Sequence, residues 1–269
     1  MKKGITYYFG FTGNFEERVK AIANAGFDEV ILNADSRFES QNGKFSKQIK
    51  LFKKYGVGFS SLHFRYKEKE LTEFWKDNSI GKTMQKNLIK DIKLAKKHGF
   101  SCVVVHLKGK TSKIGYSRLD KALKLCAKLN IPLAFENLSE NQILFEVLEH
   151  YKDNPYAKFC YDAGHHNFAD CDFDFLKIYG DKLICFHLHD NKGKASKFDA
   201  IIDEHTLNKY GSIDWDNLSK KFASLKFIPP LDYELMYKVD HGDTMDEVVN
   251  ETFKQACELE QMIEKYKNH

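Results

Sequence analysis

Short apolar runs alternate with longer segments of helical periodicity along the whole chain. Eight runs rich in β-branched and aromatic residues predict strands at Gly4–Phe11, Phe27–Leu32, Gly58–Leu62, Cys102–Val105, Ile131–Phe135, Ala157–Tyr161, Leu183–Leu188 and Phe227–Leu235. The segments between them have apolar residues three and four positions apart and predict helices at Phe15–Ala25, Lys44–Tyr55, Thr72–His98, Tyr116–Leu129, Gln142–Tyr151, Phe173–Tyr179, Trp215–Ala223 and Asp243–Tyr266.

Strict alternation of strands and helices is typical of α/β folds with parallel strands and right-handed crossovers. Eight repeats predict a single (β/α)₈ TIM barrel, a parallel eight-stranded fold, over residues 1–269. An open doubly wound sheet is the alternative, but no GxGxxG or phosphate-binding loop follows the first strand. Residues 190–213, after the seventh strand, interrupt the alternation of strands and helices, and we predict that they form a long functional loop.

Composition and charge narrow the classes of protein. Aromatic residues make up 14% of the chain, which indicates a packed core and not a disordered polymer. The net charge of +4 is small, and the four arginines (Arg18, Arg37, Arg65, Arg118) are few for a reader of nucleic-acid sequence. No apolar run approaches ~18 residues, so we expect no membrane-spanning helix. The six cysteines have no CxxC spacing, and we expect a reducing, cytoplasmic location. The oligomeric state stays open.

Ionisable side chains stand at the carboxyl ends of six consecutive predicted strands: His63, His106, Glu136, Asp162, His187 and Glu234. His165 follows three residues after Asp162, and the 190–213 loop adds Asp203 and His205. The strands of a parallel barrel end on one face, so these groups are expected to meet at one mouth. Carboxylates with imidazole suit Mn²⁺, Co²⁺, Zn²⁺ or Mg²⁺. We therefore predict a divalent metal site of three carboxylates and one imidazole, formed by Glu136, Asp162, His187 and Glu234. The alternative is that these four side chains form buried ion pairs and bind no metal.

Six short motifs, in this order and spacing, carry a resemblance to a known family: FEERVKAIANAGFDEV, LAFENL, CYDAGH, FHLHDN, YGSIDW and DYELMY. The chain resembles the xylose isomerase-like barrel superfamily, which contains sugar and sugar-phosphate isomerases and epimerases, and also apurinic endonucleases of the endonuclease IV type. The resemblance implies that Glu136, Asp162, His187 and Glu234 are metal ligands. It further implies that Glu136 and Glu234 transfer a proton in a metal-dependent isomerase or epimerase. The expected substrate is a small sugar, sugar phosphate or keto-acid.

The endonuclease branch gives an alternative function. There, His63, His106, His165, Asp203 and His205 match the additional ligands of a multi-zinc cluster in a metal-dependent phosphodiesterase that acts on abasic DNA. In the isomerase branch the same side chains would instead bind substrate. A non-catalytic, metal-binding barrel is a third possibility. The FHLHDN motif also leaves open whether His187 or His189 is the strand-seven ligand.

Two further details bear on the substrate. Some epimerases of the family carry an arginine six residues after the strand-seven histidine, where this chain has Gly193, so the resemblance does not name the substrate. Phe9 and Phe11, at the end of the first predicted strand, are candidates for an apolar pocket wall.

Overall fold

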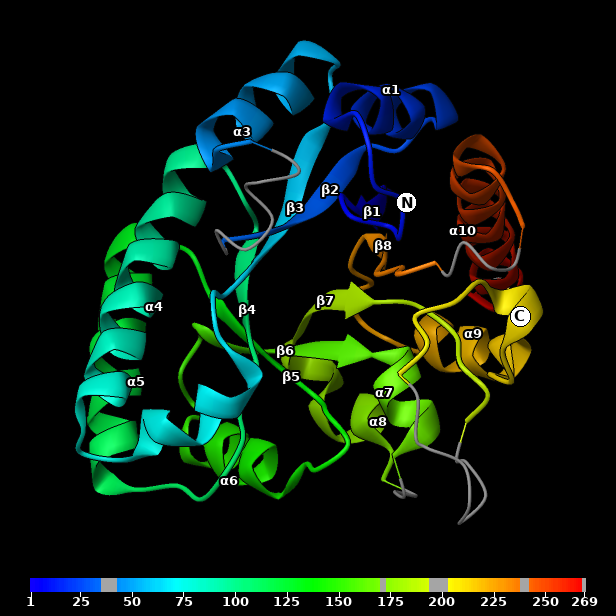
Figure 1. Cartoon of the computed structure of the whole chain (residues 1–269). Coiled ribbons are helices and arrows are strands. Elements are labelled where there is room, and N and C mark those ends of the chain that lie inside the picture. The colour runs from blue at the N-terminus through cyan, green and yellow to red at the C-terminus, as the bar shows by residue number, and fades with distance from the viewer. Residues whose placement is uncertain (35–42, 170–172, 194–202, 238–241, 268–269) are drawn as a thin grey trace.

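Eight parallel strands occupy the centre of the molecule, and helices surround them (Figure 1). The computed structural model describes residues 1–34, 43–169, 173–193, 203–237 and 242–267. The strands are β1 (Lys3–Thr6), β2 (Glu29–Asn33), β3 (Gly58–His63), β4 (Cys102–Val105), β5 (Leu133–Glu136), β6 (Ala157–Asp162), β7 (Leu183–His187) and β8 (Leu231–Tyr233). They pair in the order β7-β6-β5-β4-β3-β2-β1-β8. The predicted (β/α)₈ barrel is confirmed.

The barrel closes between β7 and β8. The backbone N–H of Leu188 donates to the carbonyl of Asp232 at 2.8 Å, and the N–H of Glu234 donates to the carbonyl of Leu188 at 2.9 Å. Leu188 also forms a parallel bridge with Tyr233. These bonds lie at the carboxyl ends of the two strands, so they set the end of β8 beside the end of β7.

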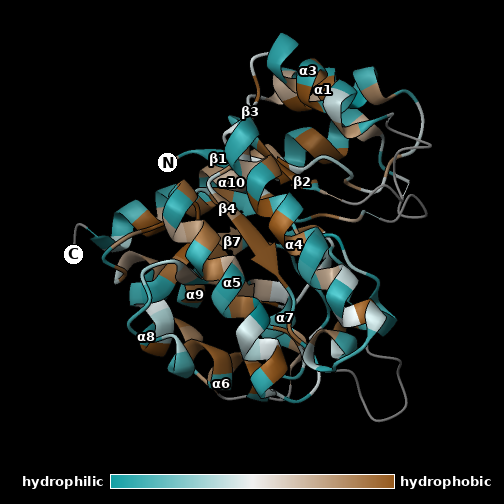
Figure 2. Ribbon diagram, turned by 90° about the vertical axis from the view of Figure 1, so that its left-hand side faces the viewer, coloured by the Kyte–Doolittle hydropathy of each residue, from teal (hydrophilic) through white to brown (hydrophobic). Residues whose placement is uncertain are grey.

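The helices present their apolar faces to the strands. Among the described residues the α-helices are α1 (Phe15–Ala25), α3 (Phe45–Lys54), α4 (Ser79–His98), α5 (Lys113–Leu129), α6 (Gln142–His150), α7 (Ala163–Phe168), α8 (Phe175–Tyr179), α9 (Trp215–Ala223) and α10 (Met245–Lys267). Short 3₁₀ turns are η2 (Glu68–Trp75), η3 (Gly180–Lys182) and η4 (Asn208–Tyr210). Hydrophilic residues cover the outer sides of α4 and α5 (Figure 2). None of the helices in the described ranges combines the length and apolar character needed to cross a bilayer.

The first and last strands are shorter than predicted. The strand predicted at Phe227–Leu235 begins only at Leu231, because Pro229 and Pro230 have no N–H to donate to a sheet. The strand predicted at Gly4–Phe11 ends at Thr6. Gly10 then takes a φ of +97°, and a side chain on it would collide with the backbone of Tyr237.

The helix predicted at Thr72–His98 is divided into η2 and α4. Asn78 begins α4, since its side chain accepts the N–H of Gly81 at 2.8 Å. Arg118 of α5 donates to the carbonyls of Phe74 and Lys76 just before this point. These carbonyls are satisfied by another helix, so the chain breaks there instead of continuing one long helix.

The interior of the barrel holds an apolar cluster of its own, separate from the larger core. Its members are Cys102, Val104, Ala134, Cys160 and Cys185. Side chains two positions apart on a strand share a face. Cys160 therefore faces the same way as Asp162, and Cys185 the same way as His187. The cluster lies inside the barrel, directly below the residues at the strand ends.

Candidate active site

A cavity of about 420 Å³ opens at the carboxyl ends of the strands. Six of the nine predicted site residues line it: His63, His106, His165, Asp203, His205 and Glu234. The other three, Glu136, Asp162 and His187, are between 0% and 1% exposed. The side chains singled out in the sequence are therefore brought together, with the most buried of them at the floor.

The four predicted metal ligands form one compact group. Glu136, Asp162, His187 and Glu234 each offer a ligand atom, and these atoms all lie within 4.8 Å of one another. His187 Nδ1 is 3.2 Å from Glu136 Oε2 and 3.1 Å from Glu234 Oε2. A buried imidazole among carboxylates fits a divalent cation, which would bind the carboxylate oxygens and the lone pair of the neutral imidazole.

A second group adjoins the first and shares Glu136. His106 Nε2 is 3.0 Å from Glu136 Oε2 and 3.2 Å from His63 Nε2. His63 Nε2 lies 3.6 Å from the same carboxylate oxygen. His63 and His106 therefore both face Glu136.

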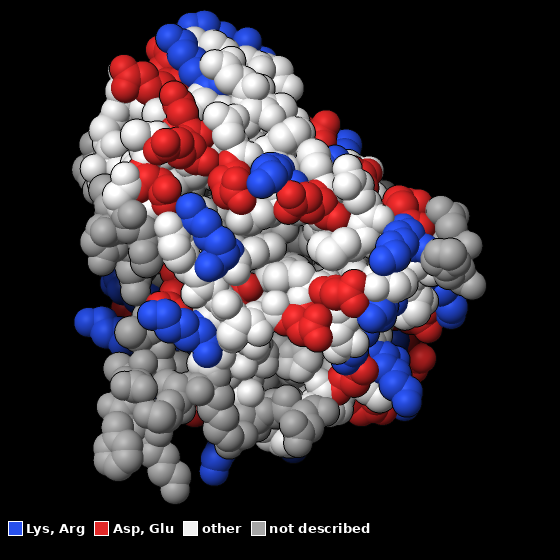
Figure 3. All heavy atoms as spheres, turned by 90° about the vertical axis from the view of Figure 1, so that its right-hand side faces the viewer, with Lys and Arg blue, Asp and Glu red and all other residues white. Residues whose placement is uncertain are grey.

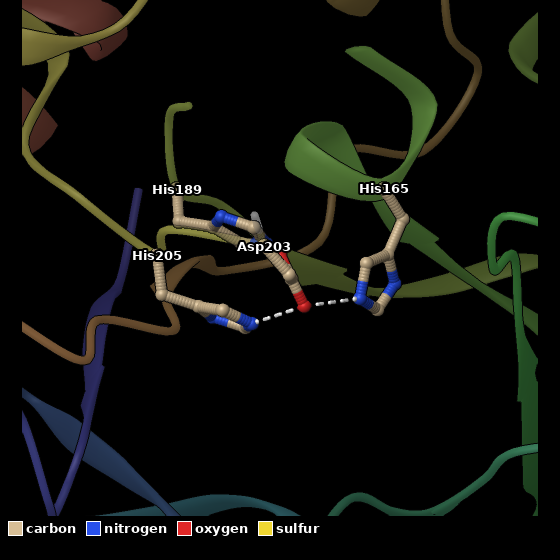
Figure 4. Close-up of side chains that lie close together, drawn as sticks. All are labelled: His165, His189, Asp203 and His205. Carbon is tan, nitrogen blue, oxygen red and sulfur yellow. Dashed lines mark hydrogen bonds and ion pairs between the residues drawn. The ribbon is translucent and has the colours of Figure 1, made fainter. Parts of the chain in front are cut away.

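A third group contains His165, His189, Asp203 and His205 (Figure 4). Asp203 Oδ2 lies 2.8 Å from His205 Nε2 and 3.1 Å from His165 Nε2. The rings of His189 and His205 stack with centroids 3.7 Å apart. His189 Nε2 is also 3.0 Å from Asp162 Oδ1. His187 thus belongs to the four-residue group, and His189 to the group around Asp203.

The charges of these groups depend on one another. Burial raises the pKa of Glu136, but the nearby His106 and His187 outweigh burial and hold this pKa well below its usual range. His187 and His205 likewise lower the pKa of Glu234 against the effect of burial. Burial lowers the pKa of His165, yet Asp162 and Asp203 raise it well above its usual value. In the metal-free site, Glu136 and Glu234 are therefore held ionised and His165 is held protonated.

Asn137 ties the ends of β5 and β6 together. Its side chain accepts the N–H of Asp162 and donates to the carbonyl of Asp162, both at 2.8 Å. The backbone carbonyl of Asn137 contacts His165 Nδ1 at 2.9 Å, and Asp162 Oδ1 accepts the N–H of His165 at 2.6 Å. We did not predict this role. The available signal was an amide directly after Glu136 at a strand end.

Asp190 fastens the long loop to the barrel. Its carboxylate accepts N–H groups of Ser212 at 2.9 Å, Ile213 at 3.1 Å and the Trp215 indole at 2.7 Å. Its backbone pairs with Thr206 in an antiparallel bridge, immediately after His205. Of the predicted loop at 190–213, residues 194–202 lie outside the described residues. The described part of the loop delivers Asp203 and His205 to the pocket.

The pocket walls differ from the sequence prediction. Phe9 is fully buried in the core, and neither it nor Phe11 lines the pocket. Thr6 and Tyr8 from the first strand region line it, with Asn33, Phe64, Tyr66 and Phe168. At the rim, Lys108 forms an ion pair with Glu68. The prediction failed because Phe9 shares a face with the buried Ile5 and Tyr7, whereas Thr6 and Tyr8 on the other face line the pocket.

Several solved structures have the same fold as this chain. One solved structure, a D-tagatose 3-epimerase-like protein, has a TM-score of 0.75 and 18% identity, covering 98% of this chain and 99% of its own. The IOLI protein with a bound zinc atom has a TM-score of 0.76 and 16% identity, covering 99% of both chains. A 3-keto-D-glucoside 4-epimerase from E. coli has a TM-score of 0.71 and 13% identity, covering 96% of this chain and all of its own. At these identities the likeness is one of fold.

Sequence comparison also finds relatives. An uncharacterised protein, y4fM of Sinorhizobium fredii, is 31% identical over 115 residues, or 40% of this chain. The alignment spans 35% of that protein, about a third of its length. The family model described as xylose isomerase-like TIM barrel matches residues 19–255, which is most of the chain. On this match, the protein belongs to the xylose isomerase-like TIM barrel family.

Proposed function

We propose that the protein is a metal-dependent isomerase or epimerase of a small carbohydrate. The observation that carries the proposal is the four-residue group at the pocket floor, in which ligand atoms of Glu136, Asp162, His187 and Glu234 lie within 4.8 Å of one another. Three carboxylates and an imidazole suit Mn²⁺, Co²⁺, Mg²⁺ or Zn²⁺. The epimerase-like structures of the same fold, and the zinc in the IOLI protein, support this reading.

A divalent ion, when bound, supplies Lewis-acid polarisation of a substrate carbonyl. The proton transfers belong to the side chains of the chain itself. Glu136 at the end of β5 and Glu234 after β8 both contact His187 Nδ1, and both have a lowered pKa that keeps them ionised. One carboxylate removes the proton from the carbon beside the carbonyl and becomes a carboxylic acid. The other, protonated from solvent before it acts, returns a proton to the neighbouring carbon or the opposite face, and the first then releases its proton to solvent, so the protons balance. The protonated His165 lines the pocket, and a substrate oxygen that takes the place of Asp203 at its Nε2 would accept a hydrogen bond from it.

The pocket walls favour a neutral polyol over a phosphate ester. Thr6, Tyr8 and Asn33 present hydroxyl and amide groups, which pair with sugar hydroxyls. Lys108 is the single Lys or Arg among the described residues that line the pocket, and Glu68 neutralises it. A phosphate group would have to compete with Glu68 for that lysine.

The test is metal-dependent exchange of a carbon-bound proton. Protein loaded in turn with Mn²⁺, Co²⁺, Mg²⁺ or Zn²⁺ is incubated in D₂O with a panel of keto-sugars, and deuterium incorporation is followed by NMR. We expect exchange with at least one sugar, lost in Glu136→Gln and in Glu234→Gln and kept in the surface variant Asp181→Asn. Metal content is measured on every sample. Absence of exchange across the panel from fully loaded protein would exclude the proposal.

Hydrolysis of a phosphodiester is the second candidate, and a specific observation favours it. The His63–His106–Glu136 group and the group of His165, Asp203 and His205 each hold donors within 4.8 Å of one another, as a site for several ions requires. Against it, Lys and Arg are interspersed with Asp and Glu on the face in Figure 3, where the described residues form no continuous basic surface. Two or three ions per chain, with cleavage of an abasic duplex, would decide for the hydrolase.

A further inference from the structure

The barrel interior beneath the candidate site carries thiols where branched apolar side chains are usual. Cys160 and Cys185 are direct register partners on β6 and β7, and their side chains face inward. Cys102 on β4 belongs to the same buried cluster. We call these three residues the thiol layer. Each is at most 2% exposed and forms no disulfide.

His187 lies between the thiol layer and the pocket floor. One ligand nitrogen of His187 and the sulfurs of Cys160 and Cys185 all lie within 4.8 Å of one another. His187 is 0% exposed, and its Nδ1 lies 3.2 Å from a carboxylate oxygen of Glu136 and 3.1 Å from one of Glu234. A metal-binding histidine normally donates its second N–H to a carboxylate, a carbonyl or water. Here the neighbours on the inner side are sulfur atoms.

We propose that Cys160, Cys185 and His187 form a second metal site, of a different chemical class from the carboxylate group above it, for a thiophilic ion such as Cu(I). Thiolates are soft ligands that select Cu(I) and disfavour Mg²⁺ and Mn²⁺, and imidazole also binds copper. Donors bound about 2.3 Å from one ion in a trigonal plane stand about 4 Å apart, which the observed spacing allows. Binding releases the two thiol protons to solvent.

The shared histidine makes the two sites antagonistic. An ion bound by Cys160 and Cys185 also binds the imidazole of His187. The same imidazole contacts Glu136 and Glu234 in the carboxylate group. By linkage, each ion then weakens the other by the same factor. This antagonism rests on the proposed function of the carboxylate group, whereas the binding of Cu(I) to the thiol layer does not.

The experiment uses the full chain, stripped of metal and kept reduced under anaerobic conditions. Cu(I) is offered from a coloured chelator, and transfer to the protein is read from the loss of colour. We expect one Cu(I) per chain in the wild type, and loss of this uptake in Cys160→Ala and in Cys185→Ala. The matched control is Cys126→Ala, a buried cysteine of α5 outside the thiol layer, which keeps the uptake. No uptake by the wild type, or unchanged uptake in both thiol variants, would overturn the proposal.

A second measurement does not depend on the folding of variants. X-ray absorption at the copper edge of the loaded wild type is expected to show two sulfur neighbours and one nitrogen neighbour. A shell of nitrogen and oxygen alone would overturn the assignment. The double variant Glu136→Gln with Glu234→Gln is expected to retain Cu(I), since it leaves the thiol layer intact, and loss of Cu(I) there would place the copper at the carboxylate group instead. Failure of sugar exchange would leave each of these outcomes unchanged.

Discussion

Replacing Asp190 with asparagine tests how the long loop is held. The Asp190 carboxylate is fully buried. Its Oδ1 accepts the N–H groups of Ser212 and Ile213, and its Oδ2 accepts the indole N–H of Trp215. Asparagine has nearly the same shape but offers one acceptor oxygen, so its NH₂ group must face at least one of these donors. The variant therefore loses the charge and leaves at least one partly buried donor without an acceptor.

The expected loss follows from these contacts. Hydrogen bonds to a charged group contribute about 1.5–3 kcal/mol each, and a buried donor left unpaired costs about 1–3 kcal/mol. With one or two donors unpaired and the others weakened, we expect Asp190→Asn to lower the free energy of unfolding by about 3–5 kcal/mol. For a chain of this size that corresponds to a fall in Tm on the order of 10 °C.

Urea denaturation followed by tryptophan fluorescence and circular dichroism measures the effect. The control is Asp181→Asn, whose carboxylate is 76% exposed and contacts Lys226 at 3.0 Å, and which should leave the midpoint unchanged. A loss below about 1 kcal/mol in Asp190→Asn would refute the reasoning. It would mean that the hydrogen bonds to Asp190 do not hold the loop.

Three further predictions concern the site itself. In metal-free protein, the hydrogen bond with Asp203 outweighs burial and raises the pKa of His205 to about 9. The stability that this proton contributes is complete below about pH 6.5 and is lost as pH rises through about 9, so urea midpoints should fall over that range, and the fall should be smaller in Asp203→Asn. Asp162→Ala and His187→Ala should each lose bound metal in emission spectroscopy after dialysis, and full occupancy in folded variants would contradict the ligand assignment. His106→Ala combined with His205→Ala should leave the metal count at one in an isomerase, but lower it and abolish cleavage of abasic duplex in a hydrolase.

The strand-end residues could be predicted because their placement follows from local rules. Each apolar run fixes the end of a strand, and a parallel barrel collects those ends at one mouth, which is how Glu136 and Glu234 come together from opposite parts of the chain. The proline pair Pro229–Pro230 was an available signal for the late start of β8, and the prediction did not use it. These cases need only the sequence around each strand.

Other features depend on contacts between distant segments. The break before α4 is stabilised by Arg118, more than 40 positions away from the carbonyl of Phe74 that it binds. No local pattern near Asn78 contains that information. Likewise, Asp203 and His205 could be recognised as ligand types, but their approach to His165 depends on the hydrogen bonds that Asp190 accepts across the loop.

The closure of the barrel by β8 has a kinetic consequence. Glu234 follows directly after the strand whose backbone bonds with Leu188 complete the cylinder. A folding chain with seven paired strands still lacks one member of the four-residue group, so an ion that needs all four side chains binds only after closure. Such an ion is absent from earlier transition states, and it should slow unfolding while leaving the folding rate unchanged. Refolding and unfolding rates measured with and without a divalent ion would therefore show whether β8 closes the barrel before or after the rate-limiting step of folding.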